Sequence, residues 1–429
     1  MKKLLIVSRE FLPSRVVSSQ RIGAFSKFLP EYGFTVHVIT QCEDQLARSG
    51  EELRLRQVLP ECASEESTIA CVPGAQRSAR LVLRAQDRLN AICRMGGIVG
   101  SLAAFVRKPF SAYAFYTFGE HNAWVRNAVQ QAIESADRTS PDGVFATFGG
   151  EYWNLGAASQ IAKRLRIPLV LDFRDGWDWF FGFSGRRSLI YPMMRRFVRR
   201  STLITAATRS VQDRLTQFWP NAPVELVYNG FDISTSAFAL GSRSPATDEI
   251  KIGHLGTFWP NPRWCDFCQA LEHVARTTPI RLIYRGRNPD QFRHALPWGT
   301  SPPPGMTLDI AGLCDRSEIV ALYGELDMAV AAARETDRPM GSIPAKLIEA
   351  IGFSKPFIML ADRSPAYLVH FLRGCSSPHL VVDNGISVAQ IETYMLDLRR
   401  GPRSVPRMPA AYSAQRRAGE LAGKLLDVL

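Results

Sequence analysis

Residues 4–40 read LLIVSREFLPSRVVSSQRIGAFSKFLPEYGFTVHVIT, and this stretch decides the fold. Leu4–Ser8 is a short apolar run that predicts a buried strand. Ser18–Tyr32 places apolar side chains at helical spacing, and Gly33 is positioned to end that helix. Thr35–Thr40 predicts a second strand. A strand, a helix and a strand in this order predict a parallel pair with the helix packed against it.

The same alternation continues along the chain. Apolar runs that predict further strands lie at 68–72, 143–148, 169–173, 203–207, 225–228, 250–255, 280–284, 307–310, 328–332, 357–360 and 380–382. Amphipathic stretches separate most of them, Gly241–Asp248 is the best linker candidate, and Ser413–Leu429 predicts a C-terminal helix. The sequence therefore predicts an α/β fold of two doubly wound halves, each a parallel sheet with helices on both faces. Ligands of such sheets bind at the carboxyl ends of the strands, so we expect a site in the cleft between the halves.

The composition fits a globular protein of two domains or one large one, with 429 residues, 46% hydrophobic and 21% charged. These values exclude collagen, a coiled coil and general disorder. The formal net charge is +12, and most of the excess lies in residues 1–240, which carry 30 basic and 21 acidic residues. A basic first half indicates an anionic partner such as a phosphate, a nucleic acid or a membrane surface.

The cysteines and the N-terminus indicate a reduced, cytoplasmic protein. The eight cysteines are scattered, and Cys265 and Cys268 have no second pair with which to form a zinc site. The apolar run after Met1-Lys2-Lys3 is too short for a signal peptide. No uncharged run reaches the ~20 residues that span a bilayer, so we expect a soluble or peripheral protein.

The loop and helix start behind the first strand form one candidate site. The loop lacks the glycine patterns of a dinucleotide site and of a P-loop. Ser18 or Ser19 is a suitable N-cap, and the free amides that follow predict an anion site. Arg21 adds positive charge to the first turn, where the helix dipole disfavours it, which indicates a negative partner. The alternative is an arginine bonded to a neighbouring loop.

Charged side chains also gather behind the strand at 169–173. This strand end reads Asp172-Phe173-Arg174-Asp175-Gly176-Trp177. A carboxylate there can bind a hydroxyl or act as a base, and Asp175 is the candidate for that role. The alternative is an ion pair that only fixes the loop, and it is the favoured interpretation for Arg174.

The segment 339–356 reads PMGSIPAKLIEAIGFSKP and carries the most informative motif. Pro344 fits a helix start, and Lys346 and Glu349 then share one face of that helix. The lysine can meet a phosphate, and the carboxylate can accept hydrogen bonds from the vicinal hydroxyls of a ribose. The alternative is a glutamate that only stabilises the helix N-terminus.

Two other strand ends carry short motifs. Gly256-Thr257 ends the first strand of the second half and Arg263 opens the next helix, which repeats the anion-site pattern of the first half. Asn229-Gly230-Phe231-Asp232 follows the last strand before the linker, where the simple interpretation is an Asn-Gly turn.

Taken together and in this order, these segments resemble the GT-B glycosyltransferases, especially family 4. Leu4–Arg21 with Gly33–Thr40 resembles the family's first strand, loop and helix. Asp172–Trp177 resembles its D-x-R-D-x-W strand end, and Tyr228–Asp232 resembles its N-G-[FV]-D motif. Ile343–Pro356 resembles its P-x-K-x-x-E helix. The resemblance covers almost the whole chain, and four motifs in the right order are specific for fold and superfamily.

The resemblance implies two Rossmann-like domains that face an interdomain cleft. Residues 1–236 would lie on the acceptor side, residues 249–405 would bind the nucleotide sugar, and the helix at 413–429 would pack back on the first domain. Glu349 matches the glutamate that usually binds the donor ribose, and Lys346 matches a lysine on the same helix near the donor.

On this basis we expect three groups of site residues. The donor-binding group is Gly256, Thr257, Arg263, Ile343, Pro344, Lys346 and Glu349. The acceptor-side group is Ser18 and Ser19. The catalytic group is Asp175, Glu151 and Arg21. Its carboxylates would orient or deprotonate the acceptor hydroxyl, and its arginine would meet the leaving diphosphate.

The implied activity is transfer of a hexosyl group from a nucleoside diphosphate sugar to a glycan or lipid-linked acceptor, in polysaccharide or glycolipid assembly. Family members typically retain the anomeric configuration, need no metal and use no cofactor apart from the nucleotide sugar. The sequence offers no Asp-x-Asp pair and no cluster of histidines for a cation. It departs from the family at Gly341, where many members have a glutamate, and at Thr257, where many have an arginine.

Two basic clusters, residues 77–108 and 186–214, suit peripheral docking on the anionic inner face of the plasma membrane. The alternative is a solvated helix face. No nucleic-acid-binding pattern accompanies the charge, so nucleic acid is not an expected partner. Two other functions stay open. One is a nucleotide-sugar 2-epimerase, against which the scarcity of histidines at the strand ends argues, and the other is a non-catalytic GT-B scaffold subunit.

Overall fold

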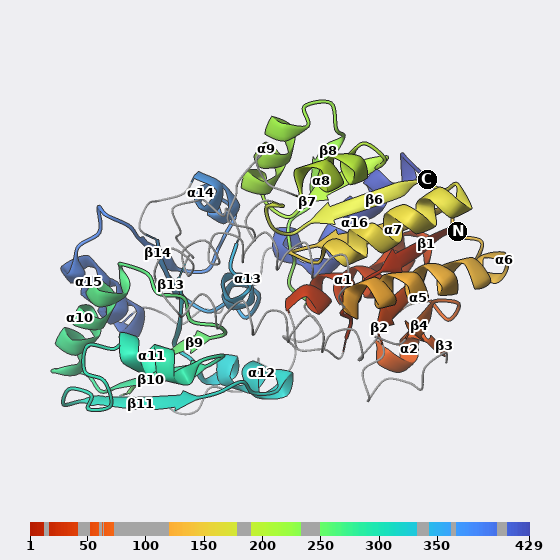
Figure 1. Cartoon of the computed structure of the whole chain (residues 1–429). Coiled ribbons are helices and arrows are strands. Elements are labelled where there is room, and N and C mark those ends of the chain that lie inside the picture. Colours follow the sequence, from red (N-terminus) through yellow and green to blue (C-terminus); the bar gives the residue numbers. More distant parts are fainter. Residues whose placement is uncertain are drawn as a thin grey trace, which may run out of the picture. The chain divides into compact units, whose positions relative to one another are not determined.

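The computed structural model describes residues 1–12, 17–41, 52–59, 62, 64–72, 120–177, 190–232, 249–332, 343–361, 366–400 and 410–429. The chain forms two compact units, residues 1–228 with 417–429, and residues 229–416 (Figure 1). Three features that the sequence singles out lie outside the described residues: the linker 241–248, the basic cluster 77–108 and Gly341.

The first unit is built on a sheet with the strand order β3-β4-β2-β1-β5-β6-β7-β8. The strands are β1 (Lys2–Val7), β2 (Phe34–Gln41), β3 (Glu52–Arg54), β4 (Thr68–Val72), β5 (Gly143–Phe148), β6 (Leu169–Phe173), β7 (Leu203–Ala206) and β8 (Val224–Leu226). Neighbouring strands are parallel, except that β3 runs antiparallel to β4. The strand order reverses between β1 and β5, which is the point where ligands of doubly wound sheets bind.

Helices connect these strands and cover the sheet. They are α1 (Val17–Phe28), η1 (Leu29–Tyr32), α2 (Leu55–Val58), α5 (Glu120–Glu134), α6 (Ala136–Thr139), α7 (Tyr152–Leu165), α8 (Tyr191–Val198), α9 (Arg209–Phe218) and α16 (Ala414–Leu426). The first predicted helix is an α-helix that tightens into a 3-10 turn at Pro30. Gly33 ends it with a φ of 86°, a left-handed conformation that glycine adopts without strain.

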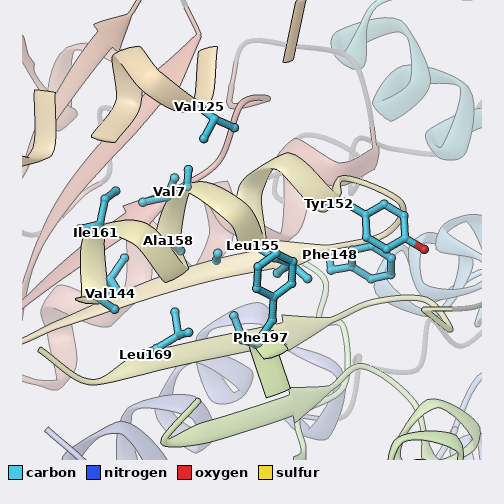
Figure 2. Close-up of a cluster of buried hydrophobic side chains, with 14 of the residues drawn as sticks. Val7, Val125, Val144, Phe148, Tyr152, Leu155, Ala158, Ile161, Leu169 and Phe197 are labelled. Carbon is cyan, nitrogen blue, oxygen red and sulfur yellow. The ribbon is translucent and has the colours of Figure 1, made fainter. Parts of the chain in front are cut away.

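One hydrophobic core fixes the ends of β5 and β6. Figure 2 shows α7 presenting Leu155, Ala158 and Ile161 toward Val144 and Leu169 of those strands. All five side chains are fully or almost fully buried. Burial of each large aliphatic side chain contributes about 1.5–3 kcal/mol, so the sheet is a rigid support for the loops behind its strands.

The second unit repeats the architecture with the strand order β11-β10-β9-β12-β13-β14, in which all neighbours are parallel. Its strands are β9 (Ile250–Leu255), β10 (Ile280–Arg285), β11 (Met306–Ala311), β12 (Met328–Ala332), β13 (Phe357–Leu360) and β14 (His379–Val382). Its helices are α10 (Trp264–Ala275), α11 (Pro289–Ala295), α12 (Arg316–Glu325), α13 (Ala345–Gly352), α14 (Ala366–Leu372), α15 (Val388–Arg400) and η4 (Ala410–Tyr412). The order reverses between β9 and β12. The predicted α/β class with two doubly wound sheets is therefore confirmed.

Two distant segments of the second unit lie side by side. The amide of Phe231 donates to the carbonyl of Tyr412 at 2.7 Å, and the amide of Ala414 donates to the carbonyl of Phe231 at 2.7 Å. Gly230 permits this approach, because a Cβ there would lie 2.6 Å from Ala414 Cα. Asn229–Asp232 is thus a bridge to the C-terminal segment and more than the turn that its Asn-Gly pair predicts.

Within the described part of the chain, no helix combines the length and the apolar character that crossing a bilayer requires.

Candidate functional site

The strand reversal of the second unit gathers part of the predicted donor group. Gly256 and Thr257 directly follow β9, and α13 begins after the segment that leaves β12. β9 and β12 are neighbours, so their carboxyl ends lie together. The crevice at such a reversal is where α/β sheets hold their ligands.

Lys346 of α13 extends to the end of β9. Its Nζ donates to the carbonyl oxygen of Thr257 at 2.7 Å and to Nε2 of His254 at 3.0 Å. A Cβ on Gly256 would lie 3.5 Å from the lysine Cε, and Gly256 has a φ of 124°. The structure therefore brings Lys346 together with Gly256 and Thr257, which the sequence analysis assigns to the same donor group.

The surroundings of Lys346 lower the pKa of its ammonium group. Burial lowers the pKa of Lys346 to about 7, although the nearby Glu349 carboxylate acts in the opposite direction. Burial, with the adjacent lysine, also lowers the pKa of His254 well below its usual value. His254 is therefore neutral near pH 7, and its ring nitrogen can accept the hydrogen bond from the lysine.

Glu349 lies one turn further along α13 and already has a partner. Its Oε1 accepts a hydrogen bond from Nη1 of Arg316, the first residue of α12. The Glu349 side chain is 14% exposed and that of Arg316 is 41% exposed. Tyr323 of α12 donates to the carbonyl of Lys346 at 3.3 Å and stacks on Phe353. These contacts hold α13 against α12 and orient the carboxylate.

Three other predicted donor residues have different surroundings. Ile343 is buried, and Pro344 is the N-cap of α13, directly before its first helical residue, Ala345. Arg263 is the N-cap of α10, where its guanidinium pairs with Asp266 at 2.5 Å and with Asn384. Among the described residues, no hydrogen bond or ion pair joins Arg263 to Lys346 or Glu349.

Arg21 in the first unit forms a buried ion pair. Its Nε and Nη2 donate to the two carboxylate oxygens of Asp172 at 2.9 and 2.8 Å, and Nη2 also donates to the carbonyl of Val227 at 2.8 Å. Asp172 further accepts from Thr147 at 3.0 Å and Thr205 at 2.6 Å. Burial alone would raise the pKa of Asp172, but Arg21 and these hydrogen bonds hold it below its usual value.

This pairing corrects the predicted role of Arg21. Its side chain is only 4% exposed, which leaves almost no surface with which to meet a leaving diphosphate. The alternative left open by the sequence, an arginine bonded to neighbouring segments, describes its position. Arg21 ties α1 to β6 and to the chain behind β8.

Arg174 brings the two predicted catalytic carboxylates together. Its Nη2 contacts Oε1 of Glu151 at 2.6 Å, and the amide of Gly149 donates to Oε2 of Glu151 at 2.5 Å. A Cβ on Gly149 would lie 2.4 Å from Arg174 Nη2 and 3.0 Å from Asp175 Oδ2. Burial lowers the pKa of Arg174, but Glu151 and Asp175 outweigh it and the net pKa is raised.

The hydrogen bonds of Glu151 use both of its carboxylate oxygens. One oxygen of Glu151 accepts from Arg174 and the other accepts from the amide of Gly149. Asp175 stays the candidate that the sequence gives for acting on a hydroxyl. Trp177 of the same strand end is buried against Trp219 and Phe218, and it anchors the loop.

Ser18 and Ser19 lie inside α1, which begins at Val17, and are not its N-cap. Ser19 is buried. The preceding residues 13–16 and the side chain of Ser18 are outside the described part of the chain.

Sequence reasoning missed His254 and Arg316. His254 is fully buried near the end of β9, and the residues on either side of it, Gly253 and Leu255, are buried too. A polar side chain in a buried strand requires a partner, and this rule would have singled it out. Arg316 gives no such signal, because an arginine at the start of a surface helix is ordinary.

Comparison with known proteins adds to this geometry. The sequence profile of Glycosyltransferase Family 4 matches residues 19–235, just over half of the chain. No curated protein sequence matches the chain.

Solved structures share the fold over the full length. A glycosyltransferase from Rickettsia africae ESF-5 has a TM-score of 0.61 at 13% identity, covering 99% of this chain and 98% of that one. Anabaena Alr3699/HepE, in complex with UDP and glucose, has a TM-score of 0.55 at 14% identity and full coverage of both chains. A putative UDP-N-acetylglucosamine 2-epimerase from Listeria monocytogenes has a TM-score of 0.56 at 11% identity, covering 99% and 96%.

At these identities the structures show the fold alone, which is the GT-B architecture of two parallel-sheet domains. The profile match adds the family, because it covers more than half of the chain. The chain therefore belongs to glycosyltransferase family 4.

Proposed function

We propose that this glycosyltransferase binds the diphosphate of a nucleotide sugar at Lys346 and its ribose at Glu349, and transfers the hexosyl group to a hydroxyl of a glycan or lipid-linked acceptor. The observation that carries the proposal is the position of the Lys346 ammonium, 2.7 Å from the carbonyl of Thr257 at the strand reversal. HepE, which shares the fold, was solved with UDP and glucose.

The lysine supplies charge where the reaction needs it. An ammonium has three N–H groups, and described residues take two of those of Lys346, so one can point to a phosphate oxygen. Negative charge builds up on the diphosphate as the glycosidic bond breaks. A cation held in place before the reaction lowers that barrier without having to reorganise.

The glutamate suits the ribose. One carboxylate can accept hydrogen bonds from two vicinal hydroxyls, and Glu349 lies on the same helix face as Lys346. Arg316 holds Oε1, and Tyr323 of α12 also interacts with this carboxylate, so a ribose hydroxyl would share it with both partners. These contacts fix the direction in which the carboxylate points.

Asp175 of the first unit is the proposed acceptor-side carboxylate. It would orient or deprotonate the attacking hydroxyl, while Arg174 and Glu151 fix the loop that carries it. Retention of the anomeric configuration and independence of metal ions complete the proposal, and both rest on the family. The anomeric configuration of the product, read by NMR, tests the first of these.

A thermal shift assay against UDP-, GDP-, dTDP- and ADP-sugars tests the donor site. A ligand at about 100 times its Kd stabilises a protein by ~2.7 kcal/mol, which gives a clear shift. We expect a shift with one nucleotide in the wild type and in Glu392→Ala, a control that removes a half-buried partner of His273. The Glu349→Ala variant should show no such thermal shift.

The other outcomes identify the alternatives. No shift with any nucleotide sugar would contradict the proposal and favour the scaffold subunit. Conversion of a nucleotide sugar to its 2-epimer without an acceptor would favour the epimerase.

We also propose that α8 docks on an anionic membrane. Arg195 and Arg196 of α8, with Arg199 and Arg200 just behind it, are exposed on consecutive turns. Among the described residues, none of the four has a carboxylate partner. Each basic residue near an anionic leaflet contributes about 1 kcal/mol. A lipid-linked acceptor would be reached from such a surface.

Sedimentation with vesicles of anionic lipid tests this docking. Replacing three of these arginines, Arg195, Arg196 and Arg199, by alanine should remove most of the binding at low salt. A matched control replaces Lys163, Arg164 and Arg166 at the exposed end of α7, and it should bind like the wild type. Equal loss in both variants would mean that net charge alone drives binding, and no wild-type binding would exclude the docking.

A further inference from the structure

The side chain of His254 is buried and packs against four aromatic rings. It lies near the end of β9 and is 0% exposed. Its ring stacks with Tyr284 at a centroid distance of 5.7 Å and with Phe292 at 5.9 Å. Phe258 and Trp264 meet it edge to face at 5.7 and 6.1 Å. Rings packed on this scale leave the imidazole little freedom to turn.

The one ionisable side chain that bonds to this ring among the described residues is Lys346. Its Nζ lies 3.0 Å from Nε2 of His254. A lysine donates hydrogen bonds and accepts none while it is charged, so Nε2 must carry the lone pair and the ring must be neutral. A proton on Nε2 would place two cations in contact inside the protein, at a large cost in free energy.

Other titratable groups surround the pair. Glu349 lies on α13, and Arg316 and Tyr323 reach α13 from α12. Tyr284 lies on β10 beside the histidine. Of these groups Glu349 favours the charged lysine, and burial opposes it. His254 therefore adds an uncharged acceptor where burial works against the ammonium.

We propose that His254 is a positioning residue for donor binding, whose Nε2 lone pair holds the Lys346 ammonium against the carbonyl of Thr257 at the strand end. The lysine then presents its remaining N–H in a fixed direction. A flexible side chain would have to lose rotamer freedom to do the same. This inference rests on the proposed role of Lys346 as a ligand of the donor diphosphate.

A double-mutant cycle tests whether His254 acts through Lys346. His254→Phe keeps an aromatic ring and removes the acceptor, whereas His254→Gln keeps an acceptor. The probe is the tightest binder among UDP, GDP, dTDP and ADP, measured by calorimetry. We expect His254→Phe to raise its Kd about tenfold or more, and His254→Gln to restore most of the loss.

The same change in a Lys346→Ala background should leave the Kd unaltered, because the residue through which His254 acts is gone. An equal loss in both backgrounds would overturn the inference and assign His254 a purely structural role.

A measurement on the wild type alone separates this inference from the proposed function. In protein labelled with 15N-histidine, we expect His254 at pH 6, where Lys346 is charged, to be the neutral tautomer with its proton on Nδ1 and with Nε2 unprotonated. A proton on Nε2 would overturn the inference even if nucleotides bind. If the tautomer is as expected but no nucleoside diphosphate binds, the proposed function fails while the histidine–lysine pair stands.

Discussion

Arg21 and Lys346 differ in how many of their N–H groups have a partner inside the protein. Arg21 and Asp172 are fully paired inside the first unit, whereas Lys346 keeps one N–H that no described residue takes. Both basic residues appear in the sequence as a cation near a helix start. Only the partners that the fold brings to each residue show that Arg21 has a structural role and that Lys346 can still bind a ligand.

The Arg21–Asp172 pair should be essential for stability. Arg21→Ala leaves a buried carboxylate without its partner, and breaking such a pair costs about 3–5 kcal/mol. Urea denaturation at pH 7 measures the loss. A loss under about 1 kcal/mol would contradict the buried geometry.

The pH dependence of the same variant has a defined sign. The pKa of Asp172 is lowered in the folded protein, so its ion pair contributes stability above the unfolded value of about 3.9. That contribution is lost as the pH falls through the folded pKa. The stability difference between wild type and Arg21→Ala should therefore shrink at acid pH.

Donor binding should weaken as the pH rises through about 7. The ammonium form of Lys346 binds the diphosphate, and its pKa in the free protein is about 7. Above that pH, the Kd of a nucleotide sugar should rise by up to about tenfold per pH unit. Calorimetry from pH 6 to 9 measures it, with Lys346→Arg as the control that stays charged. A flat profile in the wild type would contradict the assignment.

The sequence predicts those features of the candidate site that depend only on the spacing of residues along one helix. Lys346 and Glu349 are three residues apart behind a proline, so their common helix face follows from helical geometry. Their partners were not predictable. His254 and Arg316 come from β9 and α12, and nothing in the sequence gives those contacts.

At the scale of elements, Gly230 lies where the segment 229–232 meets the C-terminal segment, and the close approach there leaves no room for a side chain. A Cβ on Gly230 would lie 2.6 Å from Ala414 Cα and 2.7 Å from Ala414 N, and a backbone cannot move aside as a side chain can. We expect Gly230→Ala to destabilise the protein by about 1–3 kcal/mol. Gly423→Ala on α16 is the control, because no atom lies within 4 Å of its added Cβ.

Thermal unfolding of both variants measures this effect. Gly423→Ala should be neutral or stabilising by up to about 1 kcal/mol, since alanine favours a helix. Equal melting temperatures for the two variants would contradict the close contact at Gly230.

The elements themselves were largely predictable from hydrophobic runs. β5, β6 and β12 have the predicted bounds, because both faces of a central parallel strand are buried and most of its residues are apolar. β3 was not predicted. It is a three-residue antiparallel edge strand, too short to show a pattern. α1 begins at Val17, so the predicted N-cap serines lie within its first turn.

At the scale of the whole molecule, the fold depends on the pattern of elements rather than on residue identity. The chain matches a solved glycosyltransferase over 99% of its length at 13% identity. Both units have the strand order of a doubly wound sheet, which places the loops behind β1 and β5, and behind β9 and β12, at ligand-binding positions. The specific chemistry then depends on a few side chains at those strand ends.

The central claim is that Lys346 and Glu349 of α13 hold the donor nucleotide. A crystal structure of the protein with the nucleoside diphosphate that stabilises it tests this most directly. We predict a diphosphate oxygen about 2.7–3.0 Å from Lys346 Nζ and a ribose hydroxyl on Glu349. A nucleotide bound elsewhere, with Lys346 still bonded only to Thr257 and His254, would contradict the account.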